Sequence, residues 1–113
     1  PDPFLTVGEP CVTSCELDGV VEIGWQIGNR GSELRAGSEV LLLGVDATGA
    51  EVELATAAVG VVASGEVLAG GIFEIRGPDL QGLVSLILRV EGFGTDCLVG
   101  DTEVALPSPC AGR

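Results

Sequence analysis

The chain has no histidine, no lysine and no tyrosine, and its 113 residues include one tryptophan and three phenylalanines. Histidine, lysine and tyrosine are, beside the carboxylates, common proton-transfer groups in enzymes, and no nucleophile motif is present either. Two acidic residues hydrolyse a substrate only where a cleft brings them together, which a single small domain rarely provides. We therefore expect a protein that is not an enzyme.

Basic residues and long apolar runs are also scarce. Five arginines stand against seventeen aspartates and glutamates, which gives a formal net charge of -12. A field of this sign repels phosphate backbones and anionic lipid, so nucleic-acid binding is not expected. A solvated acidic surface is the simplest interpretation, with cation attraction or a basic partner as alternatives. No apolar run reaches the roughly 18 residues of a membrane helix, so membrane insertion is not expected.

Short apolar stretches of alternating polarity are abundant, in a chain that is 46% hydrophobic. Because aromatic residues are few, the core must consist mainly of valine, leucine, isoleucine and alanine, which favours strands over helices. Residues 20–28 alternate with period two, which predicts a strand whose inward positions are Val21, Ile23, Trp25 and Ile27, with Trp25 as a core residue. The same reasoning predicts strands at 4–7, 39–45, 51–54, 67–76, 83–91 and 100–106, and an irregular strand at 55–63.

Several of these elements carry further predictions. Residues 39–45 are apolar almost throughout, which indicates a central strand, and 46–50 form a hairpin turn to an edge strand at 51–54. Gly70-Gly71 predicts a bulge, and 32–38 a polar loop. A second core strand is expected where the alternating apolar positions are Val84, Leu86, Leu88 and Val90.

Seven or eight strands at spacings of roughly 8 to 12 residues, without a helix of three turns, are typical of an immunoglobulin-like sandwich of two antiparallel sheets. The length fits a single all-β domain over residues 1–113. We find no internal repeat, and the proline-rich ends resemble linker stubs of a longer protein. Because the chain begins at Pro1 without a leader, we expect a processed product or an excised segment.

Four cysteines lie near the two ends of the chain, at Cys11, Cys15, Cys97 and Cys110. Their spacing does not match paired zinc ligands and no histidine is present, so disulfides are expected rather than metal ligands or reduced thiols. Disulfides indicate the periplasm, the cell surface or the extracellular medium. If successive strands alternate in direction, a bridge from the Cys11/Cys15 pair to Cys110 is expected. Cys97 then takes the remaining partner, although it lies nominally at the opposite pole, and a Cys11–Cys15 bridge is an alternative.

A family resemblance rests on short segments spread over most of the chain. These are Thr6-Val7, residues 27–31, residues 39–43, Ser64-Gly65-Glu66, and residues 90–102 from Val90-Glu91 through Asp96-Cys97 to Gly100-Asp101-Thr102. Their progression resembles the cell-adhesion-related domain of bacteria, CARDB. The resemblance implies an immunoglobulin-like sandwich that serves for spacing or adhesion in a surface protein, without catalytic residues. Asn29 and Gly31 correspond to its strand-end turn, where we expect a left-handed backbone and a local side-chain hydrogen bond.

The function expected from these observations is a non-catalytic structural, adhesive or protein-interaction module of a secreted or cell-surface bacterial protein. Its partners would be neighbouring domains or another protein, and the apolar segment 59–68 is a candidate sheet edge or interdomain surface. Equally, this segment is compatible with plain core.

The alternative is a calcium-dependent binding domain, because hard cations bind where several loop oxygens converge. No aspartate-rich loop with calcium-binding spacing is present, and no cofactor is expected otherwise. The weak candidate ligands are Asp96, Asp101 and Glu103 near one loop, and Glu16 and Asp18 near another.

Overall fold

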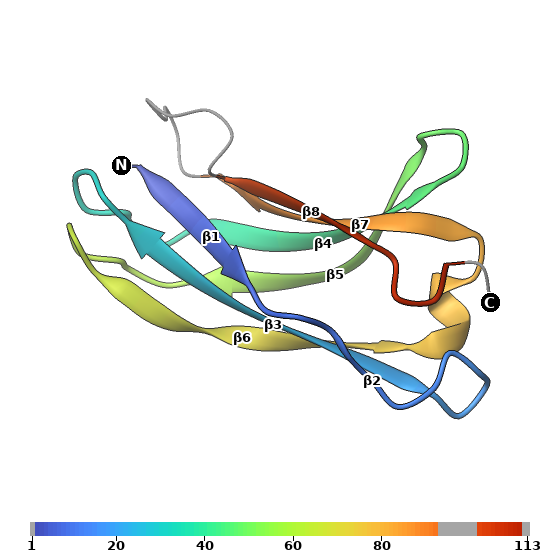
Figure 1. The fold of residues 1–113 in the computed structure, drawn as a ribbon. Coiled ribbons are helices and arrows are strands. Elements are labelled where there is room, and N and C mark those ends of the chain that lie inside the picture. The colour runs from blue at the N-terminus through green and yellow to red at the C-terminus, as the bar shows by residue number, and fades with distance from the viewer. Residues whose placement is uncertain (1, 93–101, 112–113) are drawn as a thin grey trace.

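The computed structural model describes residues 2–92 and 102–111, and gives residues 68 and 69 as backbone only. Two antiparallel sheets face each other (Figure 1). Strands of the first sheet are β1 (Pro3–Val7), β2 (Cys11–Val12), β3 (Val20–Asn29) and β6 (Val67–Arg76); those of the second are β4 (Ser38–Asp46), β5 (Glu51–Val59), β7 (Leu83–Glu91) and β8 (Glu103–Pro107). The predicted all-β, two-sheet immunoglobulin-like sandwich is confirmed. The described part of the chain holds one short helix, the 3-10 turn η1 (Gly77–Leu80).

The order of the strands explains which of them are covered. In the first sheet, β1 and β2 lie end to end along one side of β3, and β6 pairs with its other side. The second sheet has the order β5-β4-β7-β8, so β4 is internal and β5 is an edge strand, as predicted. If β1 and β2 are counted as one interrupted strand, β5 is the fourth strand of the domain. In a constant-type immunoglobulin domain the fourth strand belongs to the sheet that contains the first strand, whereas here β5 pairs with β4 in the second sheet.

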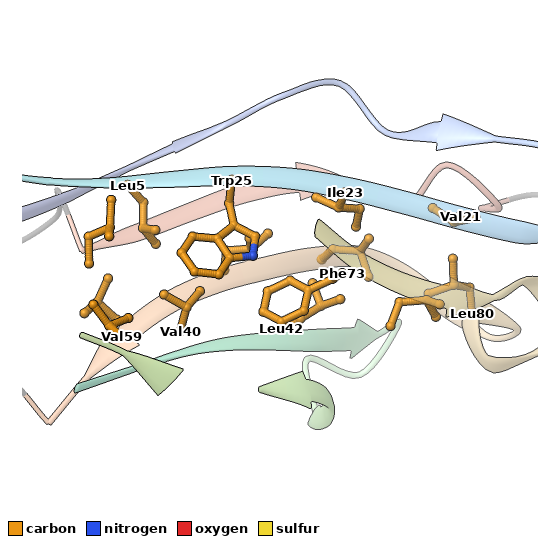
Figure 2. Close-up of a cluster of buried hydrophobic side chains, with 14 of the residues drawn as sticks. Leu5, Val21, Ile23, Trp25, Val40, Leu42, Val59, Phe73 and Leu80 are labelled. Atoms are coloured by element: carbon orange, nitrogen blue, oxygen red, sulfur yellow. The ribbon is translucent and has the colours of Figure 1, made fainter. Parts of the chain in front are cut away.

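The core lies between the sheets and is aliphatic, apart from two aromatic rings. The inner positions of β3 are Val21, Ile23, Trp25 and Ile27, all at most 8% exposed, which confirms the predicted parity. Figure 2 shows Trp25 next to Phe73, and their ring centroids are 5.8 Å apart. The indole Nε1 is buried and makes no hydrogen bond within the described residues. The remaining core residues that the close-up labels are Leu5, Val40, Leu42, Val59 and Leu80.

A bulge is present in β6 at residues 69–70, so it includes Gly70 of the predicted Gly70-Gly71 pair and lies one position earlier. The register of β6 with β3 shifts, because Trp25 pairs with Gly71 whereas Ile27 pairs with Leu68. A Cβ atom on Gly70 would lie 2.0 Å from the carbonyl oxygen of Trp25, so only glycine fits there. The bulge therefore depends on the close approach of the two backbones beside the buried indole.

The structure corrects four expectations about the elements. Alternation fails at Val84, which is 47% exposed, because the β4–β7 register shifts there and Leu83 takes the buried position. β2 was not predicted, since two residues carry no periodic signal. Residues 55–59 continue β5 rather than forming a separate irregular strand. The predicted polar loop at 32–38 contains buried Leu34, which forms a β-bridge with Val62.

Candidate functional site

Cys15 and Cys110 form a disulfide that joins segments 95 residues apart in the sequence. The predicted bridge from the Cys11/Cys15 pair to Cys110 is confirmed, and the alternative Cys11–Cys15 pairing is wrong. Cys11 is exposed and forms no disulfide with another described residue, while Cys97 lies outside the described residues. The bridge indicates folding in an oxidising compartment.

The segment around this bridge packs tightly against η1. A Cβ atom on Gly77 would lie 2.7 Å from the carbonyl carbon of Cys15, and the Gly77 amide donates a 2.9 Å hydrogen bond to the Gly19 carbonyl. Cys110 is itself buried. We call this end of the sandwich, defined by Cys15, Gly77 and Cys110, the disulfide pole.

The opposite end of β3 is held by a buried asparagine. Oδ1 of Asn29 accepts hydrogen bonds from the amides of Asp2 at 2.9 Å and Gly31 at 3.1 Å. Its Nδ2 donates to the carbonyls of Ser32 at 2.6 Å and Val62 at 3.2 Å. All four hydrogen-bonding positions of the amide are used, so the side chain ties together three segments that are distant in the sequence. We call these five residues the Asn29 cluster.

The backbone of Asn29 adds two further bonds, from its amide to the Glu66 carbonyl at 3.0 Å and from the Gly65 amide to its carbonyl at 2.7 Å. The bond from the Gly31 amide to Asn29 Oδ1 confirms the predicted local side-chain hydrogen bond of this turn. The predicted left-handed backbone is wrong here, because no described non-glycine residue has a positive φ and Gly31 has none either. The left-handed residue that contacts Asn29 is Gly65, whose φ is +78°.

The candidate calcium ligands are not brought together by the described residues. Asp96 and Asp101 lie outside the described ranges, and Glu103 binds Arg89 at 3.3 Å. Glu16 and Asp18 are exposed. Across residues 2–92 and 102–111, no three His, Cys, Asp or Glu side chains form a group that could hold a metal ion.

The carboxylate of Asp46 accepts hydrogen bonds from the turn that follows it. Its Oδ1 accepts hydrogen bonds from the Thr48 hydroxyl, the Thr48 amide at 2.9 Å and the Ala50 amide at 3.1 Å. These bonds, above all the one from the Thr48 hydroxyl, lower the pKa of Asp46 below its ordinary value. The carboxylate therefore stabilises the β4–β5 hairpin in its ionised form.

The outer face of the second sheet carries an arginine bound by three glutamates. Arg89 on β7 contacts Glu103 on β8 at 3.3 Å, Glu51 on β5 at 3.2 Å and Glu91 on its own strand at 3.9 Å. Hydrogen bonds that Arg89 donates to Glu103 and Glu51 raise the pKa of Arg89 further above its ordinary value. Leu43 on β4 is only 7% exposed without belonging to the core cluster between the sheets. Arg89 therefore neutralises part of the acidic charge of this face, on which Glu39 of β4 also stands opposite Glu91 of β7.

The outer face of the first sheet is different, because it contains a shallow groove of about 900 Å³. Ile72 of β6, which is 66% exposed, lies in this groove. Nearby, Glu22 of β3 stands directly opposite Glu74 of β6. The lining residues, none of them basic, are Thr6, Val7, Gly8, Glu9, Cys11, Glu22, Gly24, Trp25, Gln26, Gly70, Gly71 and Ile72. We call this surface the sheet-one groove.

Sequence patterns located the outward parity of Glu22 and Glu74 but did not reveal the groove. The groove depends on the pairing of β3 with β6 and on the break between β1 and β2, neither of which the sequence specifies. The candidate edge at 59–68 has mixed character instead: Val59 and Val62 are buried, whereas Val61 and Val67 are about half exposed. No helix in the described ranges is long and apolar enough to cross a membrane.

Comparison with known proteins gives a likeness of fold. No family model matches the sequence, and no curated protein matches it significantly. Among solved structures, β-glucosidase 3B from Thermotoga neapolitana in complex with glycerol is similar, with a TM-score of 0.50 and 15% sequence identity. The match covers 91% of this chain and 15% of that one, so this chain spans a small part of the other protein's length.

Proposed function

We propose that this chain is a non-catalytic interaction module of a secreted or cell-surface protein, and that it binds its partner at the sheet-one groove. The observation that carries this proposal is the contrast between the two outer faces. In the second sheet, Arg89 contacts three glutamates, including Glu91 of the opposed pair Glu39 and Glu91. The first sheet leaves Glu22 and Glu74 opposed without such a contact from any described residue, beside a groove with exposed Ile72.

The opposed pair indicates the chemistry of the partner. Like charges directly opposite each other across an antiparallel pair are destabilising. Glu22 and Glu74 form no ion pair with another described residue, although Arg76 lies two residues beyond Glu74 on the same strand. A basic side chain placed between the two carboxylates would relieve this repulsion, and the net charge of -12 would speed its approach. The fitting occupant is an extended segment that combines arginine or lysine with an apolar residue over Ile72.

A catalytic role for the same groove is less well supported. The acids lining it, Glu9 and Glu22, are both exposed. Two acids hydrolyse a substrate where a cleft encloses them together, which an open, shallow groove does not provide. We therefore propose that the groove binds a partner and does not catalyse a reaction.

The setting in a larger surface protein is supported by three observations. The disulfide favours an oxidising compartment. The resemblance to the CARDB family implies spacing or adhesion in bacterial surface proteins. The structural likeness concerns 15% of the length of a β-glucosidase chain, which is consistent with an accessory part of a longer polypeptide. Neighbouring domains are then natural partners, besides the segment that binds the groove.

A peptide titration followed by NMR tests the proposal. The probe is a synthetic nine-residue peptide in which arginine alternates with valine, added to isotope-labelled protein. We expect amide shifts concentrated on residues 22–26 and 70–74, and the Glu22→Gln/Glu74→Gln double variant should bind roughly tenfold more weakly, since two exposed ion pairs contribute about 1 to 2 kcal/mol together. The matched control, Glu53→Gln on the second sheet, should bind unchanged. Shifts spread over the acidic surface, or an equal loss in the control, would contradict a specific groove.

A further inference from the structure

Strands β1 and β2 and the residues between them are almost as extended as the part of β3 beside which they run. Pro3 pairs with Asn29 and Val12 pairs with Val21. The chain therefore advances nine residues along β1 and β2 while β3 advances eight over the same distance. Because a strand residue spans about 3.3 Å, the segment from Pro3 to Val12 exceeds the distance it covers by roughly one residue.

The disulfide turns this nearly straight segment into a covalent connection between the two ends. Cys15 follows Val12 by three residues and is bonded to Cys110, with 5.6 Å between their Cα atoms. Figure 1 shows the N-terminus and the C-terminus at opposite ends of the molecule, whose longest dimension is 43 Å. The covalent path from Asp2 to Ala111 thus passes through β1, β2 and the bridge, and bypasses residues 16–109.

We propose that, when the oxidised protein is pulled at its two ends, the tension passes through this short covalent path, and little of it acts on the bypassed part of the sandwich. The path from Asp2 to Cys15 reaches at most about 47 Å when fully extended, which is close to the 43 Å length of the folded molecule. Without the disulfide, the chain from Asp2 to Ala111 would reach roughly 390 Å. The bridge therefore acts as a redox-controlled limit on extension, and this inference holds whether or not the sheet-one groove binds a partner.

Single-molecule force spectroscopy on the full chain, held by handles at both termini, tests this directly. We expect the oxidised protein to lengthen by only about 10 to 20 Å at forces that unfold ordinary domains. After reduction, or in the Cys15→Ser/Cys110→Ser variant, one event should release roughly 350 Å. Cys11→Ser, which removes a thiol but leaves the bridge, is the matched control and should behave as the oxidised protein does.

A second attachment point distinguishes sheltering from simple mechanical resistance. One handle stays at the N-terminus and the other is moved to the β4–β5 turn at residues 47–49, which lies inside the bypassed segment. In this geometry the oxidised sandwich should unfold and release on the order of 100 Å at the same force. An oxidised protein that releases several hundred ångströms from its termini would overturn the proposal. So would one that resists equally in both geometries, because resistance would then not come from the covalent path.

Discussion

At the Asn29 cluster, which forms one pole of the sandwich, and at the disulfide pole, distant segments are fixed to the two ends of β3 by different means. Asn29 does so with four side-chain hydrogen bonds, which exist only in the folded protein. The bridge between Cys15 and Cys110 persists in the unfolded chain, and it stabilises the fold largely by restricting that chain. One pole therefore depends on the accuracy of a buried polar network, and the other on the redox state of the surroundings.

The largest effect should follow from loss of the bridge. A disulfide that closes a loop of 95 residues restricts the unfolded chain strongly, so the Cys15→Ser/Cys110→Ser variant should lose about 3 to 5 kcal/mol of unfolding free energy. Urea denaturation followed by circular dichroism measures the change, with Cys11→Ser as the control. If reduction of the wild-type protein leaves its midpoint in place, the bridge contributes nothing to stability.

The second-largest effect should follow from loss of the side-chain hydrogen bonds of Asn29. Asn29→Ala removes four hydrogen bonds and leaves two amides and two carbonyls, buried or partly buried, without their partners, which should lower the unfolding free energy by about 2 to 4 kcal/mol. Ser32→Ala is the matched control, because Ser32 joins the cluster through its carbonyl and not through its side chain. Equal stabilities for the two variants in urea would show that the network does not hold this pole.

A smaller effect at the same pole concerns backbone conformation. Gly65 has a φ of +78° and donates its amide to the Asn29 carbonyl, so Gly65→Ala should lose about 1 kcal/mol. Gly60→Ala is the matched control, since Gly60 has no positive φ and a Cβ atom there meets nothing within 4 Å. Thermal unfolding of both variants checks this, and a stable Gly65→Ala would argue against a left-handed residue at this turn.

The smallest effect is a pH dependence in the hairpin at Asp46. Hydrogen bonds from Thr48 and Ala50 lower the pKa of Asp46 in the folded state, so its contribution is present above the ordinary value of 3.8 and is lost as the pH falls through the lowered pKa. The wild type should therefore melt slightly higher than Asp46→Asn at pH 7, and the difference should vanish in strong acid. If the difference in melting temperature between the wild type and Asp46→Asn widened on acidification, the prediction would be wrong.

The sequence carried enough information for the sandwich because most strands bury one face. Alternation placed Trp25 and Ile27 inward correctly, and Gly70-Gly71 indicated the bulge. It failed at Val84, because a register shift is decided by the partner strand and not by the strand's own pattern.

How much of the candidate site the sequence predicts depends on whether a contact is local or is formed between distant segments. Chain order was enough to associate the Cys11/Cys15 turn with Cys110, because alternating strands return to the same pole. The partners of Asn29 were only partly predictable: the bond to Gly31 is local, whereas those to Asp2 and Val62 depend on how the sandwich closes. The sheet-one groove likewise arises from strands meeting across the sheet, which single-strand periodicity does not encode.

Trp25 gives the molecule an intrinsic optical label. With no tyrosine in the chain, ultraviolet emission would come almost wholly from one indole, which is only 8% exposed and lies beside Phe73 and against the Gly70-Gly71 backbone. An indole shielded from water emits at shorter wavelength than a hydrated one. Any event that parts β6 from β3 should therefore shift the colour of this fluorescence toward the red, before the remainder of the sandwich has opened.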